Sequence, residues 1–133
     1  VPARTHMAHT RPLCILVVDD YPDTAEATAQ FLALHGHDAR FAYTCAGARE
    51  ALAGDGAFVP DVVLIDVRLP DGDGFALGGE ICRLLPSRPL LIALTALPRQ
   101  EENCRAAGFD HYLLKPADPG ELVALLARYA KDR

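Results

Sequence analysis

Five short apolar runs alternate with segments of helical pattern along this chain, and this alternation restricts the possible folds most strongly. The runs cover residues 13–18, 38–42, 62–66, 89–95 and 111–116. Alternation of this kind is typical of a parallel β-sheet whose strands are joined by helices. Because such crossovers are right-handed, five strands favour the order 2-1-3-4-5. We therefore expect an α/β fold with a doubly wound, five-stranded parallel sheet.

Capping signals predict where several helices begin and end. Asp23, with Glu26 three residues later, predicts the start of a first helix that stops at Gly36. Asp118 and Pro119 predict the cap and first residue of the last helix. The other helices are expected at residues 45–53, 75–85 and 98–108.

Length, composition and charge limit the class of protein. At 133 residues and 50% apolar content, the chain fits one compact domain with a single core. The net charge of −5 and the lack of a Lys/Arg block argue against nucleic-acid or anionic-membrane binding. No run is long enough for a membrane-spanning helix. We expect proteins or small ions as partners.

The cysteines and the first residues bear on the compartment and the domain limits. The four cysteines are far apart and form no CxxC pair, which predicts buried thiols in a reducing compartment. We therefore expect a cytoplasmic protein. Residues 1–6, VPARTH, are interpreted as a remnant of a protease site and of cloning ahead of Met7, and residues 7–133 as the domain.

Four of the five apolar runs end on a polar or charged side chain. Asp19 and Asp20 follow the first run, Asp66 ends the third, Thr95 the fourth and Lys115 the fifth. In the expected topology these strand ends meet in one crevice. Three carboxylates so close together need a hard cation, and oxygen ligands open to solvent suit Mg²⁺. Asp66, single and central, is the best placed nucleophile toward a phosphoryl group.

These residues match a known family. The DD pair, then D-x-R-L-P-x-x-D-G from Asp66, T-A from Thr95 and K-P from Lys115 resemble the receiver domain of bacterial two-component response regulators. The resemblance covers about residues 13–129, and it implies a flavodoxin-like (βα)5 fold. It also implies a phosphoacceptor signalling domain, which is not an enzyme although it loses its own phosphoryl group slowly.

The resemblance assigns roles to the residues at the strand ends. It implies that Asp66 accepts a phosphoryl group from the phosphohistidine of a sensor histidine kinase or a histidine phosphotransfer protein. Asp20, Asp66 and the main-chain carbonyl of Arg68 would bind Mg²⁺, and Asp19 would assist through water. Thr95 and Lys115 would contact the phosphoryl oxygens.

The resemblance also implies a switch and a readout surface. Tyr112 matches the aromatic position that turns inward when Thr95 moves toward the phosphate. The readout would be the face formed by the fourth helix, the fifth strand and the fifth helix, and a homodimer could form on phosphorylation. The bond before Pro116 is usually cis in this family. Ala117 stands where an aromatic residue commonly follows K-P.

Two other functions remain as alternatives. A pseudo-receiver that only binds proteins would ordinarily lack one of the acids, the threonine or the lysine. A Mg²⁺-dependent phosphatase of the haloacid-dehalogenase type would place a second acid two residues after the nucleophile, where this chain has Arg68. The output of the domain is not determined by the sequence: the chain is either a single-domain regulator or a receiver belonging to a longer protein such as a hybrid kinase.

Simpler interpretations exist for individual residues. Asp19 and Asp20 could be helix caps, although Asp23 is expected to fill that role. Thr95 could cap the turn before Pro98. The sequence DGDG at residues 71–74 is interpreted as a turn rather than a calcium loop. His35 and His37 are expected to be surface residues.

Overall fold

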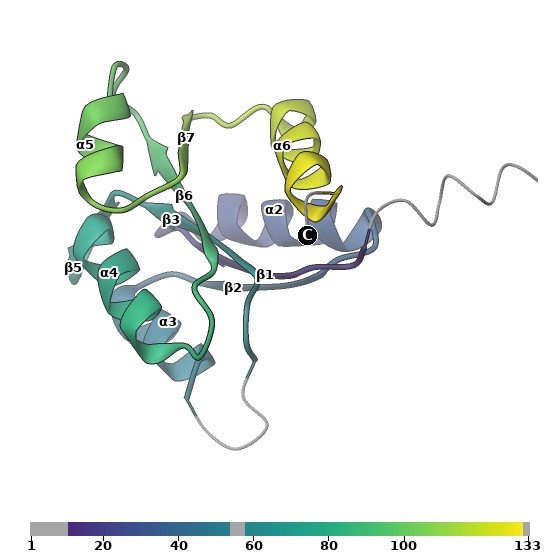
Figure 1. Ribbon diagram of the computed structural model, residues 1–133, viewed down its shortest axis with the longest axis horizontal. Coiled ribbons are helices and arrows are strands. Elements are labelled where there is room, and N and C mark those ends of the chain that lie inside the picture. Colours follow the sequence, from purple (N-terminus) through teal and green to yellow (C-terminus); the bar gives the residue numbers. More distant parts are fainter. Residues whose placement is uncertain (1–10, 54–57, 132–133) are drawn as a thin grey trace, which may run out of the picture.

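The computed structural model describes residues 11–53 and 58–131, so the interpretation of residues 1–6 lies outside the described residues. Its main sheet has five parallel strands in the order β2-β1-β3-β6-β7, with helices on both sides (Figure 1). Counted along the main sheet, this order is the predicted 2-1-3-4-5, and the flavodoxin-like fold is confirmed. The five strands are β1 (Cys14–Val18), β2 (Asp38–Ala42), β3 (Val62–Asp66), β6 (Leu90–Thr95) and β7 (His111–Leu114).

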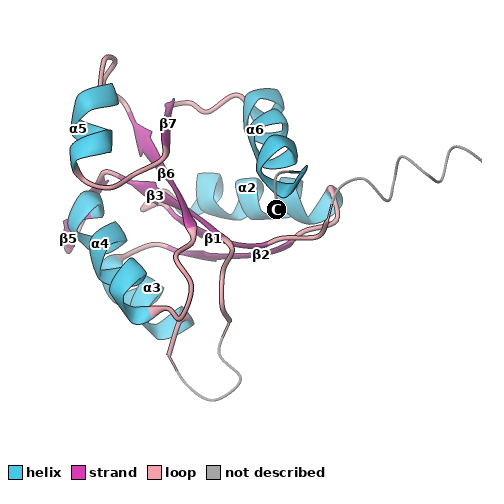
Figure 2. Cartoon of the chain, viewed as in Figure 1, coloured by secondary structure: helices cyan, strands magenta, loops and turns pink. Residues whose placement is uncertain are grey.

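The helices lie in two layers around the sheet (Figure 2). They are α2 (Pro22–Leu34), α3 (Cys45–Ala51), α4 (Gly74–Leu84), α5 (Glu101–Ala106) and α6 (Pro119–Lys131). Helices α2 and α6 cover one face, and α3, α4 and α5 cover the other (Figure 1). A two-stranded hairpin, β4 (Arg68–Leu69) with β5 (Gly72–Asp73), follows β3 directly. No helix among the described residues is both long and apolar enough to span a membrane.

The core consists of one apolar cluster on each face of the sheet. Alternate residues of the same strand point to opposite clusters, as Leu16 and Val17 of β1 do. Strands β1, β3 and β6 are buried nearly throughout, because helices cover both of their faces. Each buried aliphatic side chain contributes about 1.5–3 kcal/mol to folding. The central strands are therefore a rigid support for the residues that follow them.

Two predicted helix starts are wrong. Helix α2 begins at Pro22, and its N-cap is Tyr21, so Asp23 lies in the first turn instead of capping it. A proline is well suited to the first helical position because its missing N–H needs no partner there. Helix α5 begins at Glu101 rather than near Pro98, after Arg99 with φ of 60°. The predicted start of α6 is confirmed, because Asp118 Oδ1 accepts the Gly120 N–H at 3.0 Å.

His37 is not a surface residue. Its side chain is buried, and Nδ1 accepts the main-chain N–H of Leu13 at 3.0 Å. Burial and the nearby His35 lower the pKa of His37, which therefore stays neutral near pH 7. This bond joins the residue before β2 to the residue before β1. His35 is exposed, as expected.

Candidate functional site

The register of the sheet places the predicted site residues at the same edge. Val18 pairs with Ile65, so Asp19 and Asp66 follow paired positions on neighbouring strands. Thr95 pairs with Leu114, so Lys115 lies one residue beyond this pair. The N–H of Lys115 donates to the Thr95 carbonyl at 2.7 Å. The carboxyl ends of parallel strands meet at one edge, which is why residues far apart in the chain converge here.

Three carboxylates form a compact cluster at this edge. Oxygens of Asp19, Asp20 and Asp66 lie within 4.8 Å of one another. Asp19 and Asp66 are buried, with residue exposures of 0% and 6%, whereas Asp20 is exposed. Two buried acids and one exposed acid give the site a negative charge on the side that opens to solvent. Such a charge requires compensation.

Lys115 provides part of that compensation. Its Nζ lies 2.9 Å from Asp66 Oδ2 and 3.5 Å from Asp19 Oδ1. Burial alone would lower the pKa of Lys115, but the hydrogen bond to Asp66 and the charge of Asp19 outweigh burial and raise it. Lys115 is therefore an ammonium ion. One positive charge faces three acids, so a net negative charge remains.

Asp66 is held by its own loop as well as by Lys115. Its Oδ1 accepts the N–H of Arg68 at 3.1 Å, which fixes the carboxylate at the start of the β4–β5 hairpin. The N–H of Val67 donates to Leu94 at 2.9 Å, so the chain stays on the sheet one residue past β3. The Arg68 side chain is exposed, and its residue pairs with Asp73 across the hairpin.

Asp19 leaves one oxygen without a protein partner. Its Oδ1 accepts the N–H of Tyr21 at 3.1 Å, so Asp19 does form the local turn that the cap interpretation expected. Its Oδ2, however, is buried and has no hydrogen-bond partner among the described residues. An unpaired buried carboxylate oxygen costs free energy. A divalent cation bound by oxygen ligands fits this atom, and carboxylates together with water are oxygen ligands that Mg²⁺ uses in proteins.

The side chains of Thr95 and Tyr112 form hydrogen bonds to residues outside the acidic cluster. Thr95 is buried, and its Oγ1 accepts the N–H of Leu97 at 3.1 Å, which matches the simpler interpretation of a turn-capping threonine. The Tyr112 hydroxyl donates to Glu101 Oε2 at 3.0 Å. That hydrogen bond, and secondarily burial, raise the pKa of Tyr112. Tyr112 thereby connects β7 to the start of α5.

Sequence reasoning missed a structural role for Asp71. Residues 71–74 are expected to form a turn, but the turn of the β4–β5 hairpin is residues 70–71, whereas Gly72 and Asp73 form β5 and Gly74 begins α4. The Asp71 carboxylate also accepts the N–H groups of Cys45 at 2.8 Å and Ala46 at 3.0 Å. These two hydrogen bonds lower the pKa of Asp71. The loop that follows Asp66 is thus tied to the first turn of α3, a contact with no local sequence signal.

Comparison with known proteins identifies the family of this chain. The family model described as "Response regulator receiver domain" matches residues 15–127. An uncharacterised 14.6 kDa protein of Leptolyngbya boryana is 41% identical over 119 residues, which are 86% of this chain and 88% of that protein. The sensor histidine kinase RcsC of Salmonella typhi is 32% identical over 90% of this chain, and the response regulator PilR of Pseudomonas aeruginosa is 37% identical over 84%. The chain spans 12% of RcsC and 25% of PilR.

Solved structures with the same fold include receiver domains of response regulators. A CheY-like response regulator receiver domain protein from Methanospirillum hungatei has a TM-score of 0.79 and 25% identity, covering 92% of this chain and 96% of that chain. The BeF3-activated receiver domain of DrrB has a TM-score of 0.74 and 28% identity, covering 90% and 97%.

Proposed function

Because the chain belongs to the family of response regulator receiver domains, we propose that Asp66 is the residue that accepts the phosphoryl group. Receiver domains are signalling modules that act with histidine kinases. The observation that carries the proposal is the contact between Lys115 Nζ and Asp66 Oδ2 at 2.9 Å, inside a cluster of three acids. The donor would be the phosphohistidine of a sensor histidine kinase or of a histidine phosphotransfer protein.

Mg²⁺ is the cofactor that the acidic cluster fits. Asp20, Asp66 and the main-chain carbonyl of Arg68 would hold the ion, with Asp19 assisting through water. The buried, unpartnered Oδ2 of Asp19 supports this assignment, because a hydrated cation would satisfy it. The ion would supply neutralisation of the carboxylate and phosphoryl oxygens during transfer. Asp20, the exposed member, would complete the site on its solvent side.

The protein's own residues would position and stabilise the transferred group. An Asp66 oxygen would form a bond to phosphorus as the P–N bond to the donor imidazole breaks, and the imidazole would leave with the electron pair. Lys115, bonded to Asp66 Oδ2 beforehand, would transfer its hydrogen bond to a phosphoryl oxygen. The Arg68 N–H already holds Oδ1, so the carboxylate would stay oriented through the step.

Thr95 and Tyr112 would form the switch. In the described conformation the Thr95 Oγ1 accepts from Leu97, and Tyr112 donates to Glu101. A new phosphoryl group would attract the Thr95 hydroxyl, and Tyr112 would turn into the space that Thr95 leaves. The change would shift the population of the α5, β7 and α6 face between two arrangements. That face would serve as the readout surface and as the contact in a phosphorylation-dependent homodimer.

A cytoplasmic location agrees with these roles and remains part of the proposal. The four cysteines are free thiols, which suits a reducing compartment, but only Cys45 and Cys104 are buried, and Cys14 and Cys82 are half-buried. The net charge of −5 argues against binding to nucleic acid or to an anionic membrane.

Intact mass spectrometry tests the proposed function. We would incubate the chain with acetyl phosphate and Mg²⁺ and expect a gain of one phosphoryl mass. Asp66→Asn should abolish the gain, whereas Asp73→Asn, a matched change on the exposed hairpin, should leave it intact. Phosphorylated histidine kinase domains serve as a second donor. If neither donor adds mass to the chain, the phosphoacceptor role is wrong and the protein-binding alternative replaces it.

A further inference from the structure

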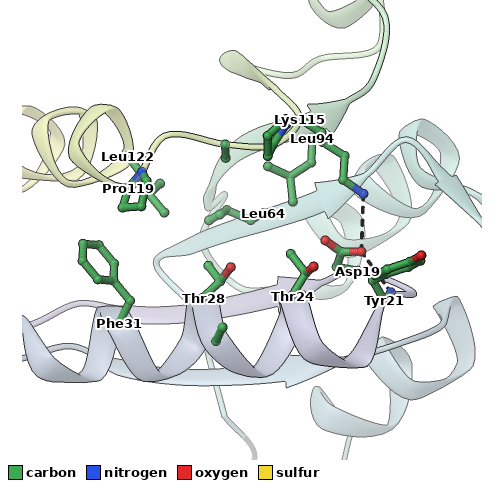
Figure 3. A pocket seen from close by; sticks show the side chains of 13 residues that line it. Asp19, Tyr21, Thr24, Thr28, Phe31, Leu64, Leu94, Lys115, Pro119 and Leu122 are labelled. Atoms are coloured by element: carbon green, nitrogen blue, oxygen red, sulfur yellow. Dashed lines mark hydrogen bonds and ion pairs between the residues drawn. The ribbon is translucent and has the colours of Figure 1, made fainter.

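An apolar cavity lies next to the acidic cluster, on the face of the sheet that α2 and α6 cover. Its volume is about 640 Å³, within the range of ligand pockets, about 300–1,000 Å³. Figure 3 shows it between α2 and the segment from Lys115 to Leu122. Asp19 and Lys115 lie at one end, and Phe31 and Leu122 at the other. Apart from Asp19 and Lys115, the residues that line it have no part in the transfer of the phosphoryl group described above.

Two hydroxyl groups and one aromatic ring form the α2 wall of this cavity. Thr24, Thr28 and Phe31 are spaced at one-turn intervals, and their side chains point into the space (Figure 3). Leu64 and Leu94 form the floor on the sheet. The lining is therefore mainly aliphatic and aromatic, with a pair of hydroxyls along one side. This combination is typical of a site for a small organic molecule.

The two charged residues at the end of the cavity contact each other. Asp19 and Lys115 are the charged residues that line it, and they lie 3.5 Å apart. Lys115 also bonds to Asp66 at 2.9 Å. Lys115 is thus held by two acids, so an anionic ligand would meet no free positive charge among the lining residues, and a cationic ligand would compete with the proposed metal ion for Asp19. A neutral ligand avoids both disadvantages.

A small residue keeps the cavity open on the α6 side. Ala117 lines it and packs against the apolar cluster that includes Leu122 and Leu126. A larger side chain at this position would extend into the same space. The methyl group of Ala117 therefore determines how much of the volume a ligand can use.

We propose that this cavity binds a neutral, mainly apolar small molecule that carries at least one hydrogen-bonding group. The apolar body would contact Phe31, Leu64 and Leu94, and the polar group would pair with the hydroxyl of Thr24 or Thr28. Binding does not depend on the phosphoacceptor role of Asp66. It adds a ligand site beside the phosphorylation site, with Asp19 and Lys115 shared between the two.

The neutral fluorescent amine N-phenyl-1-naphthylamine is a suitable probe for a titration of the full chain. We expect saturable binding at one site per chain, with the probe's N–H donating to a threonine hydroxyl. Ala117→Phe should abolish it by filling the cavity, whereas Ala124→Phe, an exposed position of α6, should not. Thr28→Val, which keeps the shape but removes the hydroxyl, should weaken binding about two- to tenfold.

Nuclear magnetic resonance provides a second measurement that does not depend on the folding of any variant. Probe-induced shifts of amide signals should concentrate on α2, on residues 115–122 and at the ends of β3 and β6. Absence of saturable binding, equal affinity in a folded Ala117→Phe variant, or shifts confined to the other face of the sheet would each overturn the proposal. Absence of binding would favour a protein side chain or helix as the occupant of the groove.

Discussion

Gly74 packs so closely against Asp66 that a Cβ atom at position 74 would lie 2.1 Å from the Asp66 carbonyl oxygen. The N–H of Gly74 also donates to the carbonyl of Val67 at 2.8 Å. The first residue of α4 is therefore in direct contact with the backbone that carries the proposed phosphoacceptor. This contact explains a glycine at a position where a helix would otherwise gain from a side chain.

Gly74→Ala should therefore disturb both folding and phosphorylation. The added methyl meets backbone atoms rather than a flexible side chain, so we expect a loss of about 3 kcal/mol in the free energy of unfolding. Gly79→Ala is the matched control on the same helix, because its Cβ would meet only Arg83 Nη1 at 3.6 Å. The control should gain about 0.5–1 kcal/mol. Urea denaturation measures both, and equal stabilities would contradict the steric argument.

The Asp71 contact leads to a prediction about local opening. Asp71→Ala removes the acceptor for the N–H groups of Cys45 and Ala46. We expect those two amides to exchange hydrogen faster, because the first turn of α3 loses its partner. Asp73→Ala is the counterpart, since Asp73 accepts the Phe75 N–H at the start of α4. It should accelerate exchange at Phe75 and leave Cys45 and Ala46 unchanged.

Hydrogen exchange monitored by nuclear magnetic resonance distinguishes these two variants. If both variants accelerate exchange at all three amides, the loop acts as one unit, and the assignment of each carboxylate to its own helix is wrong. If neither variant changes exchange, the two helix starts are held by other contacts. Separate roles for Asp71 and Asp73 require faster exchange only at Cys45 and Ala46 in the Asp71 variant and only at Phe75 in the Asp73 variant.

The acidic cluster should lower the free energy of unfolding when no metal is bound and should favour the binding of Mg²⁺. Without Mg²⁺, Asp20→Asn should raise the free energy of unfolding by about 1 kcal/mol, because it removes one of three clustered negative charges. With Mg²⁺ at 100 times its dissociation constant, the natural chain should gain about 2.7 kcal/mol. The variant should gain much less at the same concentration. Thermal unfolding with and without the ion, or with EDTA, provides the comparison.

Asp118→Asn is the control for this experiment, because Asp118 caps α6 outside the cluster. It should respond to Mg²⁺ as the natural chain does. An equal gain in stability from Mg²⁺ in the Asp20 variant would show that this residue does not contribute to the ion site. A gain in the Asp118 variant much smaller than in the natural chain would show that the effect of Mg²⁺ is not specific to the cluster.

The sequence predicts much of this structure because the decisive signals are local. The apolar runs predict β1, β3 and β6, and the acids that cluster in the structure follow or end two of these runs, Asp19 after β1 and Asp66 at the end of β3. The predicted start of α2 is wrong because Pro22, which takes the first helical position, competes with the capping signal of Asp23. With Asp23 excluded as the cap, the Asp19 carboxylate takes part in the turn before α2 as well as in the cluster.

Contacts between distant parts of the chain could not be predicted in this way. A glycine inside a helix costs stability, yet a Cβ atom at Gly78 of α4 would lie 2.5 Å from the Phe109 ring, so this glycine permits close packing. The bonds from Leu13 to His37 and from Cys45 to Asp71 join residues 24 and 26 positions apart. No periodicity or capping rule relates such pairs, and only the assembled fold brings them together.

His37 predicts how stability should change with pH. In the folded state burial lowers its pKa, and Nδ1 must stay unprotonated to accept the Leu13 N–H. In the unfolded state the pKa is about 6.5. The stabilising effect is therefore complete above about pH 6.5, decreases as pH falls toward the folded pKa, and does not decrease further below it. Between the two pKa values the His37 side chain is protonated in the unfolded chain and neutral in the folded chain.

The measurement is the free energy of unfolding from urea titrations between pH 8 and pH 5. His37→Asn should be less stable than the natural chain at pH 8, by about 1–3 kcal/mol, because the buried N–H loses its accepting ring. The difference should shrink at lower pH, because the variant lacks the group whose protonation favours unfolding. His111→Asn, a change at an exposed residue of β7, should run parallel to the natural chain. A His37→Asn curve that also runs parallel would exclude His37 as the source of the pH dependence.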